Sequence, residues 1–75
     1  MGEDMPFRSL DPVDLARAIA ALDAAWSEVA DEVPAGSEEQ ERTRLAYIIS
    51  SLIVVADDEG DLARRAIERF NKTAH

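Results

Sequence analysis

Three cationic side chains late in the sequence recur at spacings of four and three residues: Arg65, Arg69 and Lys72. In a helix, positions i, i+4 and i+7 lie on one face, so these side chains form a basic strip. Such a strip can bind carboxylates or phosphates, which makes it a candidate site for an acidic partner. The interpretation that we favour is a solvated face that complements the helix dipole. Two ion pairs are expected beside it: Asp61–Arg65 and Arg64–Glu68.

The acidic run at 57–61 invites comparison with a calcium-binding loop. In an EF-hand the glycine stands at position 6, between ligands at positions 1 and 12. Placing Gly60 there puts Val55 and Ala66 at those two ligand positions. Neither side chain can bind calcium, so we interpret the run as a turn with helix-capping carboxylates and predict no metal site.

Residues that serve as nucleophiles or bases are scarce. The chain has no cysteine, and its one histidine is the final residue, His75. Ser50 and Ser51 lie in an apolar segment, where a helical hydroxyl usually bonds a carbonyl one turn back. No glycine-rich phosphate loop is present, since the glycines lie far apart. We therefore predict no catalytic residue and no cofactor.

The net charge narrows the classes of partner. Sixteen Asp and Glu against eight Lys and Arg give a formal charge of −8. Such a surface repels phosphate backbones and anionic headgroups, so we expect neither a nucleic-acid nor a membrane partner. The segment Met1–Pro6 has no apolar stretch of the signal-peptide kind, and we expect a cytoplasmic location.

A first helix is predicted over about 11–33, after an irregular lead-in at 1–10. Asp11 is a suitable N-cap, Pro12 suits the first helical position, and Pro34 cannot continue the helix. An apolar stripe at spacings of four and three residues predicts the buried face: Leu15, Ile19, Leu22, Trp26, Val29 and Val33.

A second helix is predicted over about 37–57. Ser37 and Gln40 have the spacing of a capping box. Two i,i+4 pairs are expected in its first half: Glu38–Arg42 and Gln40–Arg44. The segment 45–56 then contains no charged residue. It is shorter than the roughly 20 apolar residues that span a bilayer, so we expect a buried helix.

A third helix is predicted over about 61–73, with one apolar face: Leu62, Ala63, Ala66, Ile67 and Phe70. Its start has two readings. Either Gly60 terminates the preceding helix, or Asp58 caps a third helix that already includes Gly60.

Three helices with short turns predict an all-α fold, a three-helix up-down-up bundle over 11–75 as a single domain. A chain this small has a marginal core, and without cysteine it has no disulfide to support it. The helix at 37–57 carries apolar residues on more than one face, so we expect a homodimer through it. The predicted interface residues are Trp26, Tyr47, Ile49, Ile53 and Val54.

The function that these features favour is a small acidic protein–protein interaction module that self-associates and has no catalytic activity. An alternative is an acidic regulator that binds a basic surface of a larger protein, as a nucleic-acid mimic does. The partner of the second helix is accordingly either another copy of the chain or a heterologous protein.

The order of elements over 11–70 resembles a group of short, uncharacterised bacterial helical proteins. The matching residues are Ala24-Ala25-Trp26, Arg44-Leu45-Ala46 with Ile48-Ile49, Gly60-Asp61, and Leu62 with Ala66. The turn at 57–61 is shorter and more acidic than in that group. The group has no established activity, so the resemblance implies the helical fold alone.

Overall fold

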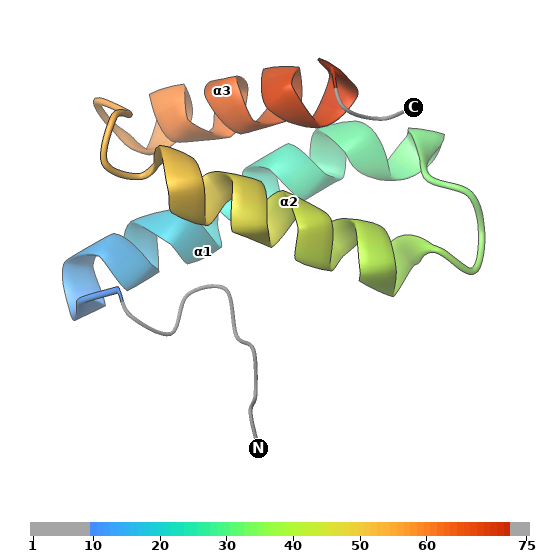
Figure 1. The fold of residues 1–75 in the computed structure, drawn as a ribbon, viewed down its shortest axis with the longest axis horizontal. Helices are drawn as coiled ribbons and strands as arrows, with labels where there is room; N and C mark the ends of the chain where they lie inside the picture. Colours follow the sequence, from blue (N-terminus) through green and yellow to red (C-terminus); the bar gives the residue numbers. More distant parts are fainter. Residues whose placement is uncertain (1–9, 73–75) are drawn as a thin grey trace.

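Residues 10–72 are described by a computed structural model in which three α-helices follow one another (Figure 1). The elements are α1 (Pro12–Val29), a short 3-10 helix η1 (Ala30–Glu32), α2 (Glu38–Leu52) and α3 (Glu59–Lys72). Consecutive helices run in opposite directions, and no strand occurs in the described range. The predicted all-α, three-helix fold is confirmed. Phe7, in the lead-in, and His75, the final residue of the sequence, both lie outside the described residues.

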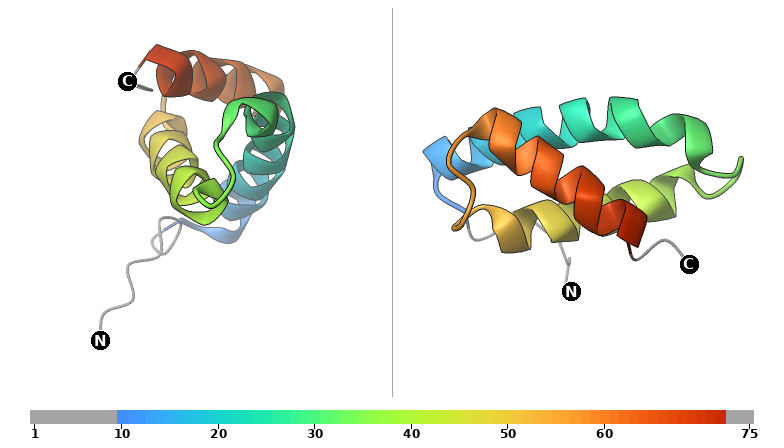
Figure 2. Two further views of the ribbon diagram at one scale, coloured as in Figure 1. Left: turned by 90° about the vertical axis from the view of Figure 1, so that its right-hand side faces the viewer. Right: turned by 90° about the horizontal axis from the view of Figure 1, so that it is seen from above.

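Each of the three helices packs against the other two. Seen end on, they stand at the corners of a triangle, and from above α3 crosses both neighbours (Figure 2). The core in the middle is wholly apolar: Ala18, Ala21, Leu22, Ala25, Val29, Leu45, Ala46, Ile49, Leu52, Ile53, Leu62, Ala63, Ala66 and Phe70. The predicted apolar face of α3 is confirmed, with Ile67 packed at its margin.

The start of α1 matches the prediction. The Asp11 side chain accepts a hydrogen bond from the Asp14 N–H at 2.9 Å, and Pro12 occupies the first helical position. This bond satisfies one of the N–H groups that a helix start leaves without a partner. After Val29 the chain tightens into η1, where the Val33 N–H donates to the Ala30 carbonyl at 3.1 Å.

The buried face of α1 differs from the predicted stripe. Its innermost residues are the alanines at 18, 21 and 25, all fully buried, together with Leu22 and Val29. Ile19 is 49% exposed, and Leu15 and Trp26 are only half-buried. Because α1 packs against two helices, its closest approach needs small side chains, since packed helix axes come within about 8–10 Å of each other. The larger apolar residues therefore lie at the edge of the contact.

The turn before α2 is built differently from the predicted capping box. The Ser37 side chain makes no capping bond, and its carbonyl accepts the first helical N–H, from Glu41, at 2.9 Å. Gly36 has a φ of 95°, in the left-handed region, and its N–H donates to Glu38 Oε1 at 3.1 Å. The carboxylate of Glu38 thus supports the turn that precedes α2.

Both arginines of α2 form ion pairs that were not predicted. Arg42 pairs with Asp23 of α1 at 3.5 Å, and Arg44 pairs with Glu41 at 2.9 Å. Tertiary packing brings Asp23 to Arg42, which spacing along α2 alone could not indicate. The Arg42–Asp23 pair ties α1 to α2 at the bundle surface.

The helix predicted to reach residue 57 ends at Leu52. The Leu52 carbonyl accepts from both the Val55 and Ala56 N–H groups at 3.0 Å, which closes the helix in a turn. Three β-branched residues, 53–55, follow Leu52, and such residues favour helix weakly. The early end leaves room for α3 to begin at Glu59 rather than at residue 61.

Gly60 belongs to α3. Of the two predicted arrangements, the one in which Asp58 caps a helix that includes Gly60 is therefore confirmed. Asp58 Oδ1 accepts from the Asp61 N–H at 2.8 Å, and the Asp58 carbonyl accepts from the Leu62 N–H at 2.9 Å. Asp58 therefore caps a helix whose first turn contains Gly60. In the part of the chain that the structure describes, no helix is both long enough and apolar enough to cross a membrane.

Candidate functional site

The basic strip of α3 lines a hollow against the end of α2. Arg65, Arg69 and Lys72 surround it together with Glu68, and Leu52 of α2 supplies its apolar wall. The volume of this basic hollow is about 200 Å³. The structure thus brings the three predicted strip residues together around one concave site. Sequence spacing placed them on one face, but the contribution of Leu52 depends on where α2 ends.

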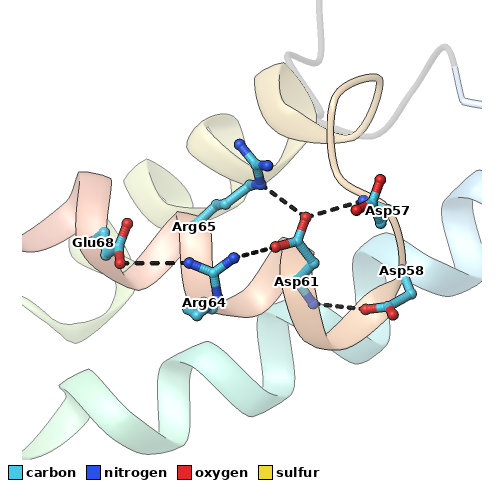
Figure 3. A network of polar contacts seen from close by, with 6 residues as sticks. All are labelled: Asp57, Asp58, Asp61, Arg64, Arg65 and Glu68. Carbon is cyan, nitrogen blue, oxygen red and sulfur yellow. Dashed lines mark hydrogen bonds and ion pairs between the residues drawn. The ribbon is translucent and has the colours of Figure 1, made fainter.

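The near end of the strip is organised around Asp61 (Figure 3). Its carboxylate accepts from the Asp57 N–H at 3.0 Å and from Arg65 Nε at 2.8 Å, and it also binds Arg64. Arg64 reaches Glu68 on its other side at 3.6 Å. Both ion pairs predicted beside the strip, Asp61–Arg65 and Arg64–Glu68, are confirmed.

This network fixes the charge states of two of its members. The hydrogen bond from the Asp57 N–H, followed by that from Arg65, lowers the pKa of Asp61 to about 2. The Asp61 carboxylate in turn raises the pKa of Arg65 above its ordinary value. Both groups are therefore charged at neutral pH. Arg65 uses Nε for Asp61, and its two terminal nitrogens point away from that carboxylate (Figure 3).

Lys72 stands at the other end of the basic hollow. Its side chain is exposed and lies in the last turn of α3, where a cation complements the helix dipole. Among residues 10–72 no carboxylate forms an ion pair with it. The hollow thus has one cation oriented by an internal carboxylate and one that extends into solvent.

The predicted dimer residues separate into two groups. Tyr47 and Val54 are 45% and 84% exposed, and Trp26 is half-buried against the core. Ile49 and Ile53, in contrast, are buried inside the bundle, which corrects their assignment to a partner-facing surface. Because α2 packs against both α1 and α3, most of its apolar residues are covered within one chain.

The exposed side of the segment 47–55, at the end of α2 and in the turn that follows it, is uncharged. Tyr47, Ser51 and Val54 follow at spacings of four and three residues, with Val55, 53% exposed, beside them. The Ser51 hydroxyl donates to the Ile48 carbonyl at 2.8 Å, as expected for a helical serine, so its polarity is partly satisfied within the helix. We call these four residues the α2 surface; Tyr47 and Ser51 belong to α2, and Val54 and Val55 lie in the turn directly after it. Ser51 and Val55 were not among the predicted interface residues. The absence of charged residues across 45–56 is the feature of the sequence that indicates both.

Two further observations bear on this region. Among residues 10–72 no group of three or more His, Cys, Asp or Glu side chains is arranged to hold a metal ion. A second, more open hollow near the α2 start is lined by Gly36, Glu39, Gln40 and Thr43.

Compared with known proteins, the chain matches no protein-family model, no curated protein and no solved structure.

Proposed function

We propose that this chain is a small protein–protein interaction module that self-associates as a homodimer through the α2 surface. The observation that carries the proposal is the exposure of Val54, 84%, within a stretch that has no charged residue. Charged residues make up 32% of the chain, so an uncharged surface of this extent is a departure from the rest. Exposed apolar patches rimmed by polar residues are typical of interaction sites.

The charge of the chain favours this surface over any other for self-association. Two copies at −8 each repel one another wherever their carboxylates approach closely. None of the four residues of the α2 surface is a carboxylate. Burial of its apolar atoms contributes about 25 cal/mol per Å² removed from water, which is significant for a domain with so small a core.

The spacing of the α2 surface suits a symmetric pair of helices. In a two-fold dimer the same patch faces itself, and the arrangement that we propose has the two α2 helices crossing antiparallel. Ser51 lies between Tyr47 and Val54 on this line and is small enough to let the helices approach. Tyr47 of one copy then lies near Val54 of the other, which pairs an aromatic ring with an aliphatic side chain.

The salt dependence of association tests the proposal. Screening shortens from about 10 Å at 0.1 M salt to about 3 Å at 1 M, which weakens repulsion between the two acidic copies. Sedimentation equilibrium should therefore show a dimer that becomes tighter as salt is raised. A monomer at both salt concentrations, up to millimolar protein, would reject self-association. An acidic regulator would instead show a monomer together with binding to a basic protein that salt abolishes.

A further inference from the structure

The basic hollow concentrates positive charge on an acidic protein. Half of the eight Lys and Arg residues lie between 64 and 72, and three of those four line the hollow. The chain as a whole carries −8. The local field at the hollow is therefore opposite in sign to that of the remaining surface, and a negatively charged group is drawn to this place on the molecule.

Arg65 is held in an orientation that suits an anion in the hollow. Its Nε is bound to Asp61 at 2.8 Å, and its two terminal nitrogens are directed away from Asp61 (Figure 3). Among the described residues no other hydrogen bond engages Arg65. A guanidinium that is already fixed loses less side-chain freedom when it binds a carboxylate, so less of the binding free energy is spent on ordering.

The one carboxylate at the rim does not neutralise the site from within. Glu68 lines the hollow, but its carboxylate pairs with Arg64 at 3.6 Å. Arg64 does not line the hollow. The charge of Glu68 is thus partly offset by a cation outside the site, and the strip keeps its net positive charge.

The dimensions of the strip match carboxylates presented by a helix. Arg65 and Lys72 are seven residues apart, which corresponds to about 10 Å along the helix axis. Acidic residues at i, i+4 and i+7 of a second helix cover the same length. Leu52 adds an apolar wall that the methylene groups of a glutamate can contact. A nucleic-acid backbone would instead bring a long run of phosphates against the chain's own carboxylates.

We propose that the basic hollow docks an acidic helical segment of a partner protein, whose carboxylates bind Arg65, Arg69 and Lys72. The segment lies along α3, with one carboxylate on the terminal nitrogens of Arg65 and another near Lys72. This interaction uses α3, not the α2 surface, and does not depend on self-association.

The test is an NMR titration of the full-length, isotopically labelled chain with a synthetic helical peptide that carries glutamate at i, i+4 and i+7. A second peptide with glutamine at these positions is the control. We expect the glutamate peptide to shift the backbone amides of α3 around Arg65 and Lys72, with a smaller effect near Leu52. The glutamine peptide should bind at least tenfold more weakly.

Two variants with the same change in net charge locate the site. Lys72→Gln removes a cation that lines the hollow, and Arg17→Gln removes one on α1 that does not. We expect Lys72→Gln to weaken peptide binding at least fivefold and Arg17→Gln by less than twofold. Equal losses, or shifts confined to α1, would overturn the proposal. So would displacement of the peptide by an equal concentration of inorganic phosphate at constant ionic strength, because the hollow would then be a simple anion site.

Discussion

The Arg44 guanidinium lies over the ring of Phe70, 4.2 Å from its centroid, and so joins the middle of α2 to the end of α3. Phe70 is buried in the core. Arg44 Nε donates to Glu41 Oε1 at 2.9 Å, which helps to hold the guanidinium over the ring. A charged side chain thus covers the edge of the core while its own charge is paired, and this contact closes the bundle at the end far from Asp61.

The Arg44–Phe70 contact should show energetic coupling. We expect Arg44→Gln and Phe70→Leu to cost less together than the sum of their separate effects, by about 0.5–1 kcal/mol, because each single change already removes the cation–π contact. Urea unfolding of the wild type, both single variants and the double variant measures this difference. Strict additivity would show that the two side chains merely lie close together.

Replacing a buried alanine of α1 by a larger residue should lower the free energy of unfolding. Ala25 is fully buried, and a leucine there overpacks the contact, so we expect Ala25→Leu to lower the free energy of unfolding by about 1–3 kcal/mol. Ala24→Leu is the matched control, since Ala24 is exposed on the same helix, and its effect should stay within about 0.5 kcal/mol. Similar losses in both variants, measured by urea unfolding, would argue against the observed orientation of α1.

Local features of the fold were predictable, because they depend on residues close together in sequence. Asp11 caps α1 and Asp61 pairs with Arg65, both as spacing indicated. The rotation of α1 was not predictable in this way. Its apolar residues cover a wider arc than two neighbouring helices can bury, and the choice between Ala18 and Ile19 as the inner residue follows from how closely the helices approach.

The two glycines within residues 10–72 should respond oppositely to substitution by alanine. Gly60 lies in the first turn of α3, and an added Cβ would meet only Asp58 Oδ1 at 3.5 Å, an ordinary contact. We therefore expect Gly60→Ala to stabilise the chain by about 0.4–1 kcal/mol. Gly36 has a φ of 95°, so Gly36→Ala should destabilise it by about 1–2 kcal/mol. Thermal unfolding checks both, and a destabilising Gly60→Ala would place Gly60 outside the helix.

Stability should fall in acid through Asp61. The native state lowers the pKa of Asp61 to about 2, below its ordinary value of 3.8, so its contribution is present above that ordinary value. Asp61→Asn should unfold at lower urea than the wild type at pH 7, and the difference should shrink as pH falls from about 4 to about 2. Glu32→Gln, which breaks no ion pair among residues 10–72, is the control. A gap between Asp61→Asn and the wild type that persisted at pH 2 would contradict the assignment.

The candidate site was predictable only in part. The basic strip of Arg65 and Lys72 follows from helical spacing alone, but the hollow that they line also needs Leu52 from the end of α2. The burial of Ile49 could not be predicted, because a sequence does not show which apolar faces of a helix its two neighbours will cover. Tyr47 and Val54 lie on the face that α1 and α3 leave exposed.

Self-association through the α2 surface is tested most directly by sedimentation equilibrium of three proteins: the wild type, Val54→Glu and Val13→Glu. Both variants add one carboxylate at an exposed valine, but Val13 lies on α1. Ile49→Glu is unsuitable, because a charge at that buried position would unfold the bundle. We predict a dimer for the wild type and Val13→Glu, and a shift of Val54→Glu to monomer, with dissociation at least tenfold more favourable. A wild-type monomer, or a dimer unaffected by Val54→Glu, would contradict the proposed function.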